Sequence, residues 1–285
     1  MLGLELLLAG LLEGVPYGLA GLGFALIFRT AKELNFAFGA TIAIGGYVTY
    51  SAAGAGAPVP LAMVLSLLVC ALIGFLLRWG IFSRLRDHFA VLLFSFALSV
   101  IIENALQVFY GVHDVVADTP AMRESITLIP GTNLMATVVQ IFGLVLLLVI
   151  WAAVWWAQAR SKTGLGMTAV IRDAEIAELV GVRSEKMKLI AYAVGSALAG
   201  VAGSLTVMDT GVRPTLGFSI LLYGFIATLL AGNRFVHTAI WGLAFAVVLN
   251  LSAVWLESQY RTLVAFAILV VYLIVRMLRL PRIAL

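Results

Sequence analysis

The chain has very few charged residues for its length. Asp, Glu, Lys and Arg together make up 11% of its 285 residues, whereas hydrophobic residues make up 63% and the mean hydropathy is +1.10. So little polar surface cannot coat a soluble globule of this size. We therefore expect a polytopic membrane protein. The net charge of +4 is better explained by orientation in the membrane than by nucleic-acid binding.

The sequence also lacks the motifs of the common catalytic and metal sites. It contains no Gly-x-x-x-x-Gly-Lys-Ser/Thr phosphate loop, no His-Glu-x-x-His, no Cys/His cluster with metal spacing and no Gly-x-Ser-x-Gly. The single Cys70 lies in an apolar run and allows no internal disulfide. These absences favour a channel, carrier or transporter subunit over an enzyme, with no cofactor or metal in this chain.

Nine apolar segments are candidates for spanning helices, which need roughly 20 mostly apolar residues. They lie at about 8–28, 35–53, 60–80, 89–109, 134–157, 189–209, 218–233, 236–256 and 262–280. No Lys or Arg precedes Arg29, so we expect the first segment to stay in the membrane rather than act as a cleaved signal peptide. The sequence thus predicts an all-α membrane bundle of eight or nine transmembrane segments, of which the second and seventh are the least regular.

The distribution of basic residues predicts the orientation of the bundle. If residues 159–188 are cytoplasmic, alternation of the segments places 15 of the 18 Lys and Arg residues inside and only Arg123, Arg213 and Arg261 outside. Cytoplasmic loops carry such an excess of positive charge. We therefore expect the N-terminus outside and the C-terminus inside, in a single transmembrane domain that covers residues 1–285.

The polar run at 159–188 holds ten of the 32 charged residues and is too polar to cross a bilayer. Asp173 can cap a short helix from Ala174 to Val180, and Gly181 can end it. Its apolar residues, Ile176, Leu179 and Val180, then fall on one side, and Glu175 and Glu178 fall on the other. This amphipathic helix is interpreted either as a helical loop resting on lipid headgroups or as a docking element for a partner protein.

Small residues mark two helices for close packing. The first segment carries a ridge of small residues formed by Gly10, Gly14 and Gly18. The sixth segment carries a second ridge, formed by Gly195, Ala199 and Gly203, which predicts a central position for this segment in the bundle. In the second segment, Asn35, Gly39, Thr41, Gly45 and Gly46 weaken the helical pattern. They indicate either a broken helix that lines a substrate path or close packing between helices.

Glu103 and Asn104 form a polar pair within the fourth segment. A carboxylate inside a membrane is costly, so it is a functional candidate, unless it lies near enough to the outer surface to reach water. An ion- or proton-coupled secondary carrier that uses Glu103 is therefore the alternative function. Such a carrier would work without an ATPase.

Several of these motifs, in this order, resemble one known family over most of the chain. They are Asn35-Phe36-Ala37-Phe38-Gly39, the run from Ala97 to Asn104, Lys162-Thr163-Gly164-Leu165-Gly166 through Gly181-Val182, and the small-residue run from Gly195 to Gly203. Taken together they look like the permeases of branched-chain amino acid ABC importers, and the chain is similar to the shorter of the two permease types.

The resemblance implies partners and residue roles. It implies a bacterial inner-membrane importer with a different second permease, two ATP-binding cassette ATPases, which would bind the ATP, and a periplasmic solute-binding protein. The cytoplasmic segment at 159–188 would then hold the helix that docks on an ATPase. That helix and its flanks would comprise Arg172, Asp173, Glu175, Ile176, Glu178, Leu179 and Gly181. The family's broken second helix favours Asn35, Phe36, Phe38 and Gly39 as residues of the translocation path. Glu103 and Asn104 are candidates for the same path as the polar pair within the membrane.

Two positions depart from the family pattern. Phe38 stands where the family usually has a polar His, and residues 231–234 replace its usual glycine-rich turn. Relatives of this kind carry branched-chain amino acids, urea, short amides, nucleosides or aromatic acids. The apolar Phe38 favours an apolar or aromatic solute.

Overall fold

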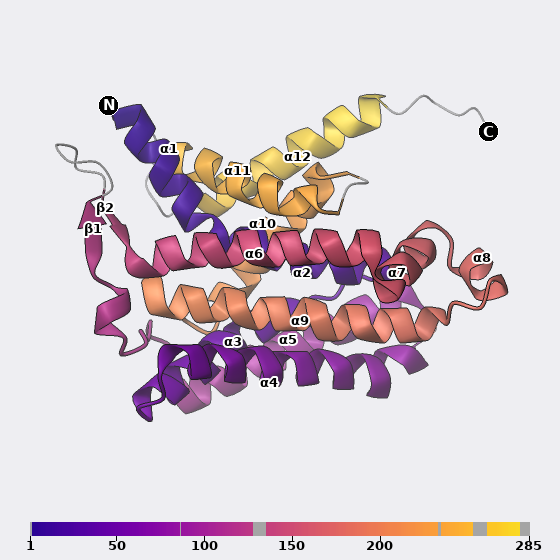
Figure 1. Ribbon diagram of the computed structural model, residues 1–285, viewed down its shortest axis with the longest axis horizontal. Coiled ribbons are helices and arrows are strands. Elements are labelled where there is room, and N and C mark those ends of the chain that lie inside the picture. The colour runs from indigo at the N-terminus through magenta and orange to yellow at the C-terminus, as the bar shows by residue number, and fades with distance from the viewer. Residues whose placement is uncertain (1, 86, 128–134, 233–234, 253–260, 280–285) are drawn as a thin grey trace.

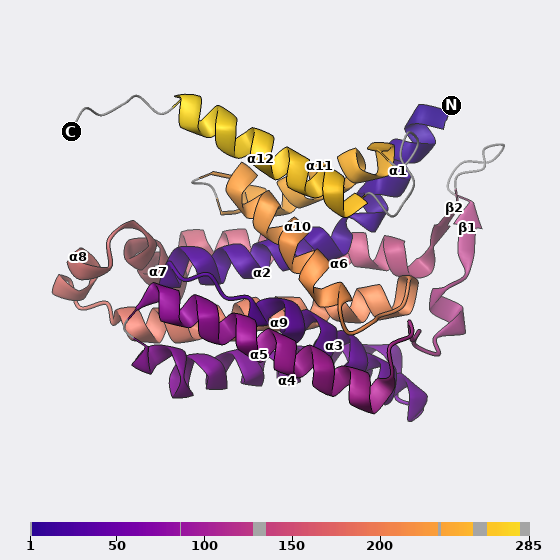
Figure 2. The same ribbon diagram turned by 180° about the vertical axis from the view of Figure 1, so that it is seen from behind.

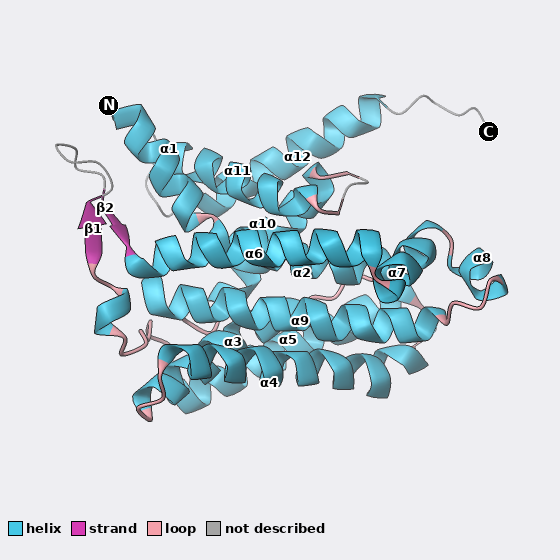
Figure 3. Cartoon of the chain, viewed as in Figure 1, coloured by secondary structure: helices cyan, strands magenta, loops and turns pink. Residues whose placement is uncertain are grey.

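Helices form nearly all of the architecture, as expected (Figure 3). The computed structural model describes residues 2–85, 87–127, 135–232, 235–252 and 261–279. The helices are α1 (Leu2–Glu13), α2 (Val15–Ala31), α3 (Ala37–Gly54), α4 (Val59–Gly80), α5 (His88–Tyr110), α6 (Val138–Arg160), α7 (Lys162–Arg172), α8 (Ala174–Leu179), α9 (Ser184–Asp209), α10 (Leu216–Leu230), α11 (His237–Ser252) and α12 (Arg261–Arg279). Two 3-10 turns, η1 (Phe82–Arg84) and η2 (Pro120–Met122), and an antiparallel pair of short strands, β1 (Ser125–Thr127) and β2 (Met135–Thr137), complete the described fold.

The centre of the bundle is α9, which lies among α2, α3 and α4 (Figures 1 and 2). About 78% of its apolar window is buried, compared with 17% for α5 and for α6. A Cβ on Gly195 would come 2.7 Å from the carbonyl oxygen of Gly23, so only a glycine lets α2 and α9 approach this closely. The predicted ridge of small residues and its central position are confirmed.

The first predicted segment, 8–28, is not one straight helix. A bend of 42° at Gly14 separates α1 from α2, and Pro16 follows at the start of α2. Proline has no N–H to donate to the carbonyl four residues earlier, which accounts for the bend. The predicted ridge of Gly10 and Gly14 packs against α11, where a Cβ on Gly10 would lie 2.9 Å from the Asn250 Cβ.

The second segment differs from the predicted broken helix. Its glycines lie inside an uninterrupted α3, and the irregular part is the non-helical connection 32–36 before it. Gly45 faces the backbone of Gly200 on α9, and Gly39 faces Gly217 on α10. The glycines therefore serve close packing between helices, and the chain leaves the helical path at Lys32, which has a positive φ of 58°.

Length and composition support part of the predicted set of eight or nine spans. Within the described residues, four helices are long and apolar enough to cross a membrane: Val59–Arg84, His88–Tyr110, Val138–Arg160 and Ser184–Asp209. The bent pair α1–α2 makes a fifth, and Leu216–Leu230, His237–Ser252 and Leu263–Val275 are shorter apolar helices. The 15 residues of α10 reach only about 22 Å at 1.5 Å per residue, less than the hydrocarbon core of roughly 30 Å.

Connections expected on one side of the membrane lie together at one end of the bundle. Glu33 after α2, Arg78 near the end of α4 and Glu185 at the start of α9 are in direct contact. At the other end, Thr137 before α6 donates a hydrogen bond to Asp209 at the end of α9. The helices from α2 to α9 thus alternate in the expected order. The side of the membrane that each end faces stays a prediction.

Candidate functional site

The short helix α8 lies within the polar run at 159–188. Its N-terminus is capped by Asp173, as the sequence predicts. The Asp173 carboxylate accepts hydrogen bonds from the backbone N–H groups of Glu175 at 2.9 Å and Ile176 at 3.0 Å. Gly181, with a φ of 87°, follows two residues after the helix ends at Leu179. The N-terminal cap and the left-handed glycine therefore fix both ends of a six-residue helix that could not be stable alone.

The apolar side chains of α8 point away from the protein. Ile176 is 59% exposed and Leu179 is 87% exposed, whereas Ala177 on the inner side is 2% exposed. Val180, Arg172, Glu175 and Glu178 are exposed as well. A small helix that presents apolar side chains at its outer surface has the character of a contact site for another surface.

Two hydrogen bonds join α8 to the residues at the start of α9. The Ser184 hydroxyl donates to the carbonyl oxygen of Ala174 at 3.2 Å, and the Val182 N–H donates to that of Ala177 at 2.9 Å. A displacement of α8 would therefore be transmitted to the first turn of α9.

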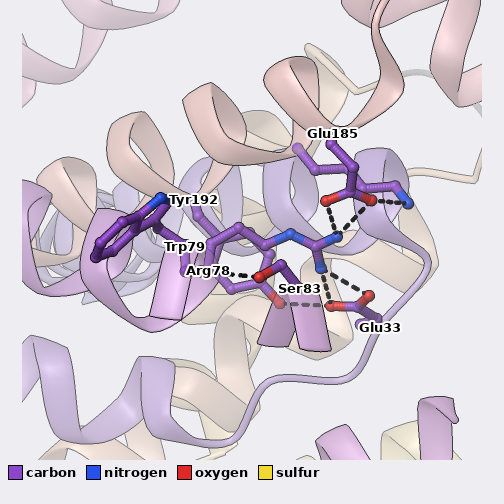
Figure 4. A network of polar contacts seen from close by, with 7 residues as sticks. Glu33, Arg78, Trp79, Ser83, Glu185 and Tyr192 are labelled. Carbon is purple, nitrogen blue, oxygen red and sulfur yellow. Dashed lines mark hydrogen bonds and ion pairs between the residues drawn. The ribbon is translucent and has the colours of Figure 1, made fainter. Parts of the chain in front are cut away.

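Next to that turn lies a buried charge network that the sequence analysis did not identify (Figure 4). The Arg78 guanidinium, which is 2% exposed as a residue, donates to both oxygens of Glu33 at 2.9 and 3.0 Å and to both oxygens of Glu185 at 2.8 and 2.6 Å. Tyr192 donates to Glu33 at 2.9 Å, and Lys188 donates to Glu185 at 2.9 Å. Bidentate contacts of this kind hold a carboxylate in a defined orientation.

The network joins two segments that the sequence analysis treated separately. Glu185 lies in the first turn of α9, beside the attachment of α8, and Glu33 lies in the non-helical connection 32–36. One guanidinium therefore joins the first turn of α9 to that connection. The only sequence signal was the presence of Glu33 and Arg78 at the ends of apolar segments.

The same non-helical connection lines a small apolar cavity of about 60 Å³. Seven of its eight lining residues are apolar, and they come from α2, the stretch before α3 and α10: Phe24, Leu34, Phe36, Phe218, Leu221, Leu222 and Phe225, with Asn35 as the eighth. The Phe36 ring stacks on Phe218, with 6.4 Å between the ring centroids. Cavities with such walls favour apolar groups over water.

The cavity lies inside the bundle rather than at its end. The backbone N–H of Phe36 donates to the Ser95 hydroxyl at 3.0 Å. Ser95 is seven residues into α5, so Phe36 lies about 10 Å along that helix from its first residue. Among the described residues, the Asn35 Oδ1 atom is buried without a hydrogen-bond partner.

The other residues predicted for the path are not at this cavity. The Phe38 ring is fully buried and contacts Phe24 edge to face, and Gly39 packs on α10, so neither lines the cavity. On α5, Glu103 accepts a 3.5 Å hydrogen bond from Ser99, and Asn104 donates to the Val100 carbonyl at 2.8 Å. The structure thus brings together Asn35 and Phe36, and adds the aromatic residues of α10, which no local sequence pattern marks.

No metal site is found in the part of the chain that the structure describes, where no three His, Cys, Asp or Glu residues are grouped suitably. The arrangement therefore offers contact surfaces and a cavity, and its polar residues hold segments together.

Comparison with known proteins gives a consistent result over nearly the whole chain. The family model described as "Branched-chain amino acid transport system / permease component" matches residues 6–273. The chain is 26% identical to the high-affinity branched-chain amino acid transport system permease protein BraD of Pseudomonas aeruginosa over 296 aligned residues, which cover 96% of this chain and 94% of BraD.

Two further relatives extend the similarity. The chain is 25% identical to the permease protein LivH of Salmonella typhimurium, with 95% of this chain and 93% of LivH covered. It is 24% identical to the probable branched-chain amino acid transport permease protein LivH of Methanocaldococcus jannaschii, with 86% and 79% covered. No solved structure matches the chain.

Proposed function

The chain belongs to the family of permease components of branched-chain amino acid transport systems, and we propose that it forms half of a translocation path and docks a cytoplasmic ATPase through α8. It is a permease component of an ABC transport system, and hence a transport subunit rather than an enzyme. We place it in the inner membrane of a bacterial cell, with the N-terminus outside and the end of the bundle that holds α8 in the cytoplasm.

The outward apolar side chains of α8 are the observation that carries this proposal. The chain has no phosphate loop, so the energy of ATP must reach it through another subunit. Ile176 and Leu179 offer that subunit an exposed apolar contact on a helix with two fixed ends. The network around Arg78 then connects the first turn of α9 with the stretch that lines the cavity.

The docking role is tested by placing charge in the contact. The double variant Ile176→Asp/Leu179→Asp should abolish copurification of the ATPase and solute uptake, because two carboxylates would be desolvated at an apolar contact. The matched control is Ser83→Asp/His88→Asp, which places two carboxylates at exposed positions outside the docking segment and should keep most of both. Normal ATPase binding and uptake in the double Asp variant would refute the docking role.

The remaining subunits follow from the transport mechanism. We propose a second, different permease beside this chain, two ATPases below the pair and a periplasmic solute-binding protein above it. Closure of the ATPases would move α8, and the two permeases would expose a central path to each side in turn. ATP is bound by the partner subunits.

We propose that the cavity next to Asn35 and Phe36 receives the apolar side chain of the solute. Its walls fit a branched-chain amino acid better than urea or a short amide, because those solutes are polar throughout. Its small volume fits a branched alkyl group better than an aromatic ring, since a cavity of about 150 Å³ is the size known to hold benzene.

Filling the cavity tests this role. Leu221→Phe should lower leucine uptake while ATPase copurification stays normal, so that a failure here is distinguishable from a failure of docking. Leu76→Phe, on an exposed position of α4, is the matched control and should leave uptake unchanged. Unchanged uptake of leucine in Leu221→Phe would exclude the cavity from the path.

The family membership decides against the secondary carrier that would use Glu103. The two mechanisms predict different energy sources: the carrier would accumulate solute from an ion gradient as an isolated chain, whereas the permease should be inactive without its ATPases.

A further inference from the structure

A second and much larger cleft lies at the end of the bundle that carries the polar run. Its volume is about 1320 Å³. Its walls come from the end of α2, the second half of α6, α7, the end of α10 and the start of α11, and α2 contacts each of the other four helices. A small-molecule site usually has about 300–1,000 Å³. The cleft therefore has room for a larger, elongated ligand.

Among the described residues, the charged side chains that line the cleft are all basic. They are Arg29, Lys32 and Arg172, together with His237, and no Asp or Glu of the described part lines it. The ion pairs of the described residues involve Arg78, Glu33, Glu185 and Lys188, so none of the three cations of the cleft has a carboxylate partner there. Arg29 donates to the carbonyl oxygen of Gly232 at 2.5 Å, which holds its side chain at the wall. Three cations without counter-ions favour an anionic ligand.

The rest of the lining is aromatic and aliphatic. Trp151 and Trp155 lie one turn apart on α6, and Phe28 of α2 and Ile240 of α11 also line the cleft. The Trp151 Nε1 atom donates to the carbonyl oxygen of Val236 at 2.8 Å, so this ring bridges α6 and the segment before α11. Trp155 and Ile240 are each more than half exposed. These side chains offer an apolar surface to a bound molecule.

Apolar residues are followed by polar ones along two of the walls. On α6, the aromatic Trp151 and Trp155 are followed by the neutral Gln158, and on α2, Phe28 is followed by Arg29 and, just after the helix ends, by Lys32. Both helices end beside α7, which contributes Arg172. The cleft is thus apolar toward the middle of the bundle and cationic toward its end. Tryptophans and basic residues take these relative positions at a membrane interface.

We propose that this cleft binds an anionic phospholipid of the cytoplasmic leaflet, with its phosphate at Arg29, Lys32 and Arg172 and an acyl chain along Trp151 and Trp155. The assignment to the cytoplasmic leaflet rests on the proposed orientation of the chain, whereas the preference for an anionic phospholipid does not. The site is separate from the apolar cavity, and it shares only Arg172 with the flank of α8 that was predicted to dock the ATPase.

Competition between lipids measures the preference. The full chain, with the subunits that copurify with it, is exchanged into detergent with equimolar phosphatidylglycerol and phosphatidylcholine, and bound lipid is counted by native mass spectrometry. Each basic residue near anionic lipid strengthens binding appreciably, so we expect about tenfold enrichment of phosphatidylglycerol in the wild-type chain. The triple variant Arg29→Gln/Lys32→Gln/Arg172→Gln should bring the ratio close to one.

Matched variants separate the site from general charge. Arg84→Gln/Arg183→Gln/Lys186→Gln removes the same charge from exposed positions outside the cleft and should keep the enrichment. Arg29→Lys/Lys32→Arg/Arg172→Lys keeps the charge and should also retain it, which excludes misfolding as the cause.

Brominated lipids locate the bound molecule. Brominated phosphatidylglycerol should quench tryptophan fluorescence more strongly than brominated phosphatidylcholine, and Trp151→Phe/Trp155→Phe should remove most of that difference. Equal binding of the two lipids by the wild-type chain would overturn the proposal, as would an enrichment that the cleft variant and the outside variant lose equally. Displacement of the bound lipid by millimolar inorganic phosphate would show a phosphate site and overturn the assignment to lipid.

Discussion

Replacing Arg78 by Gln should destabilise the protein more than any other change in its charge network. The variant removes the guanidinium that joins Glu33 and Glu185, two carboxylates in different environments. The Glu33 side chain is 7% exposed and keeps the hydrogen bond from Tyr192, whereas the Glu185 side chain is 60% exposed. The consequences for the two carboxylates should therefore differ.

The expected magnitudes follow from that difference in burial. Removing one partner of a buried ion pair costs about 3–5 kcal/mol, because the other charge stays buried and unpaired. We therefore expect Arg78→Gln to lower the free energy of unfolding by about 3–5 kcal/mol. Glu185→Gln breaks a contact that water partly replaces and should cost less than about 1 kcal/mol. The double variant Arg78→Gln/Glu33→Gln removes both charges and should recover about half of the loss, since no unpaired charge remains.

The assay is reversible unfolding of the full chain in mixed detergent and SDS micelles, followed by tryptophan fluorescence. Uptake measured in parallel separates stability from function, because Glu185→Gln should reduce uptake more than its small effect on stability explains. Equal losses of stability for Arg78→Gln and Glu185→Gln would contradict the assignment of the buried pair. A double variant less stable than Arg78→Gln would contradict it as well.

Three smaller predictions concern packing and capping. Gly217→Ala should lower the free energy of unfolding by about 1–3 kcal/mol, because its Cβ would overlap the backbone of Gly39, whereas Gly80→Ala, which meets no atom within 4 Å, should be neutral in the same assay. Asp173→Ala removes the N-terminal cap of α8, which should lower the stability of that helix by about 1 kcal/mol and weaken ATPase copurification without abolishing it. Unchanged copurification would show that docking does not depend on the cap. Asp209→Ala, which removes an acceptor from Thr137 and Gln140, should make residues 135–137 more accessible to protease, and an unchanged cleavage pattern would exclude that role.

Features set by neighbouring residues could be predicted from the sequence. The cap at Asp173 and the left-handed Gly181 depend on a few residues around one short helix, and both are present. The small-residue ridge at Gly195 likewise predicted the central position of α9, because only such a surface lets backbones approach closely.

Features that need tertiary contacts could not be predicted. Arg78 is separated in the sequence from Glu33 by 45 positions and from Glu185 by 107, so no local sequence pattern indicates the network. The cavity combines Phe36 with residues of α10 for the same reason. Hydropathy likewise shows neither the bend of 42° between α1 and α2 nor the end of α10 at Leu230.

The central claim is that α8 faces the cytoplasm and is held there by an ATPase. The most direct measurement is labelling of Leu179→Cys by a membrane-impermeant maleimide, with the parent chain as control because its single cysteine, Cys70, is buried. We predict no labelling in intact cells, strong labelling in inside-out vesicles stripped of the ATPase, and protection when the ATPase is added back. Labelling from outside intact cells, or labelling that the ATPase leaves unchanged, would contradict the account.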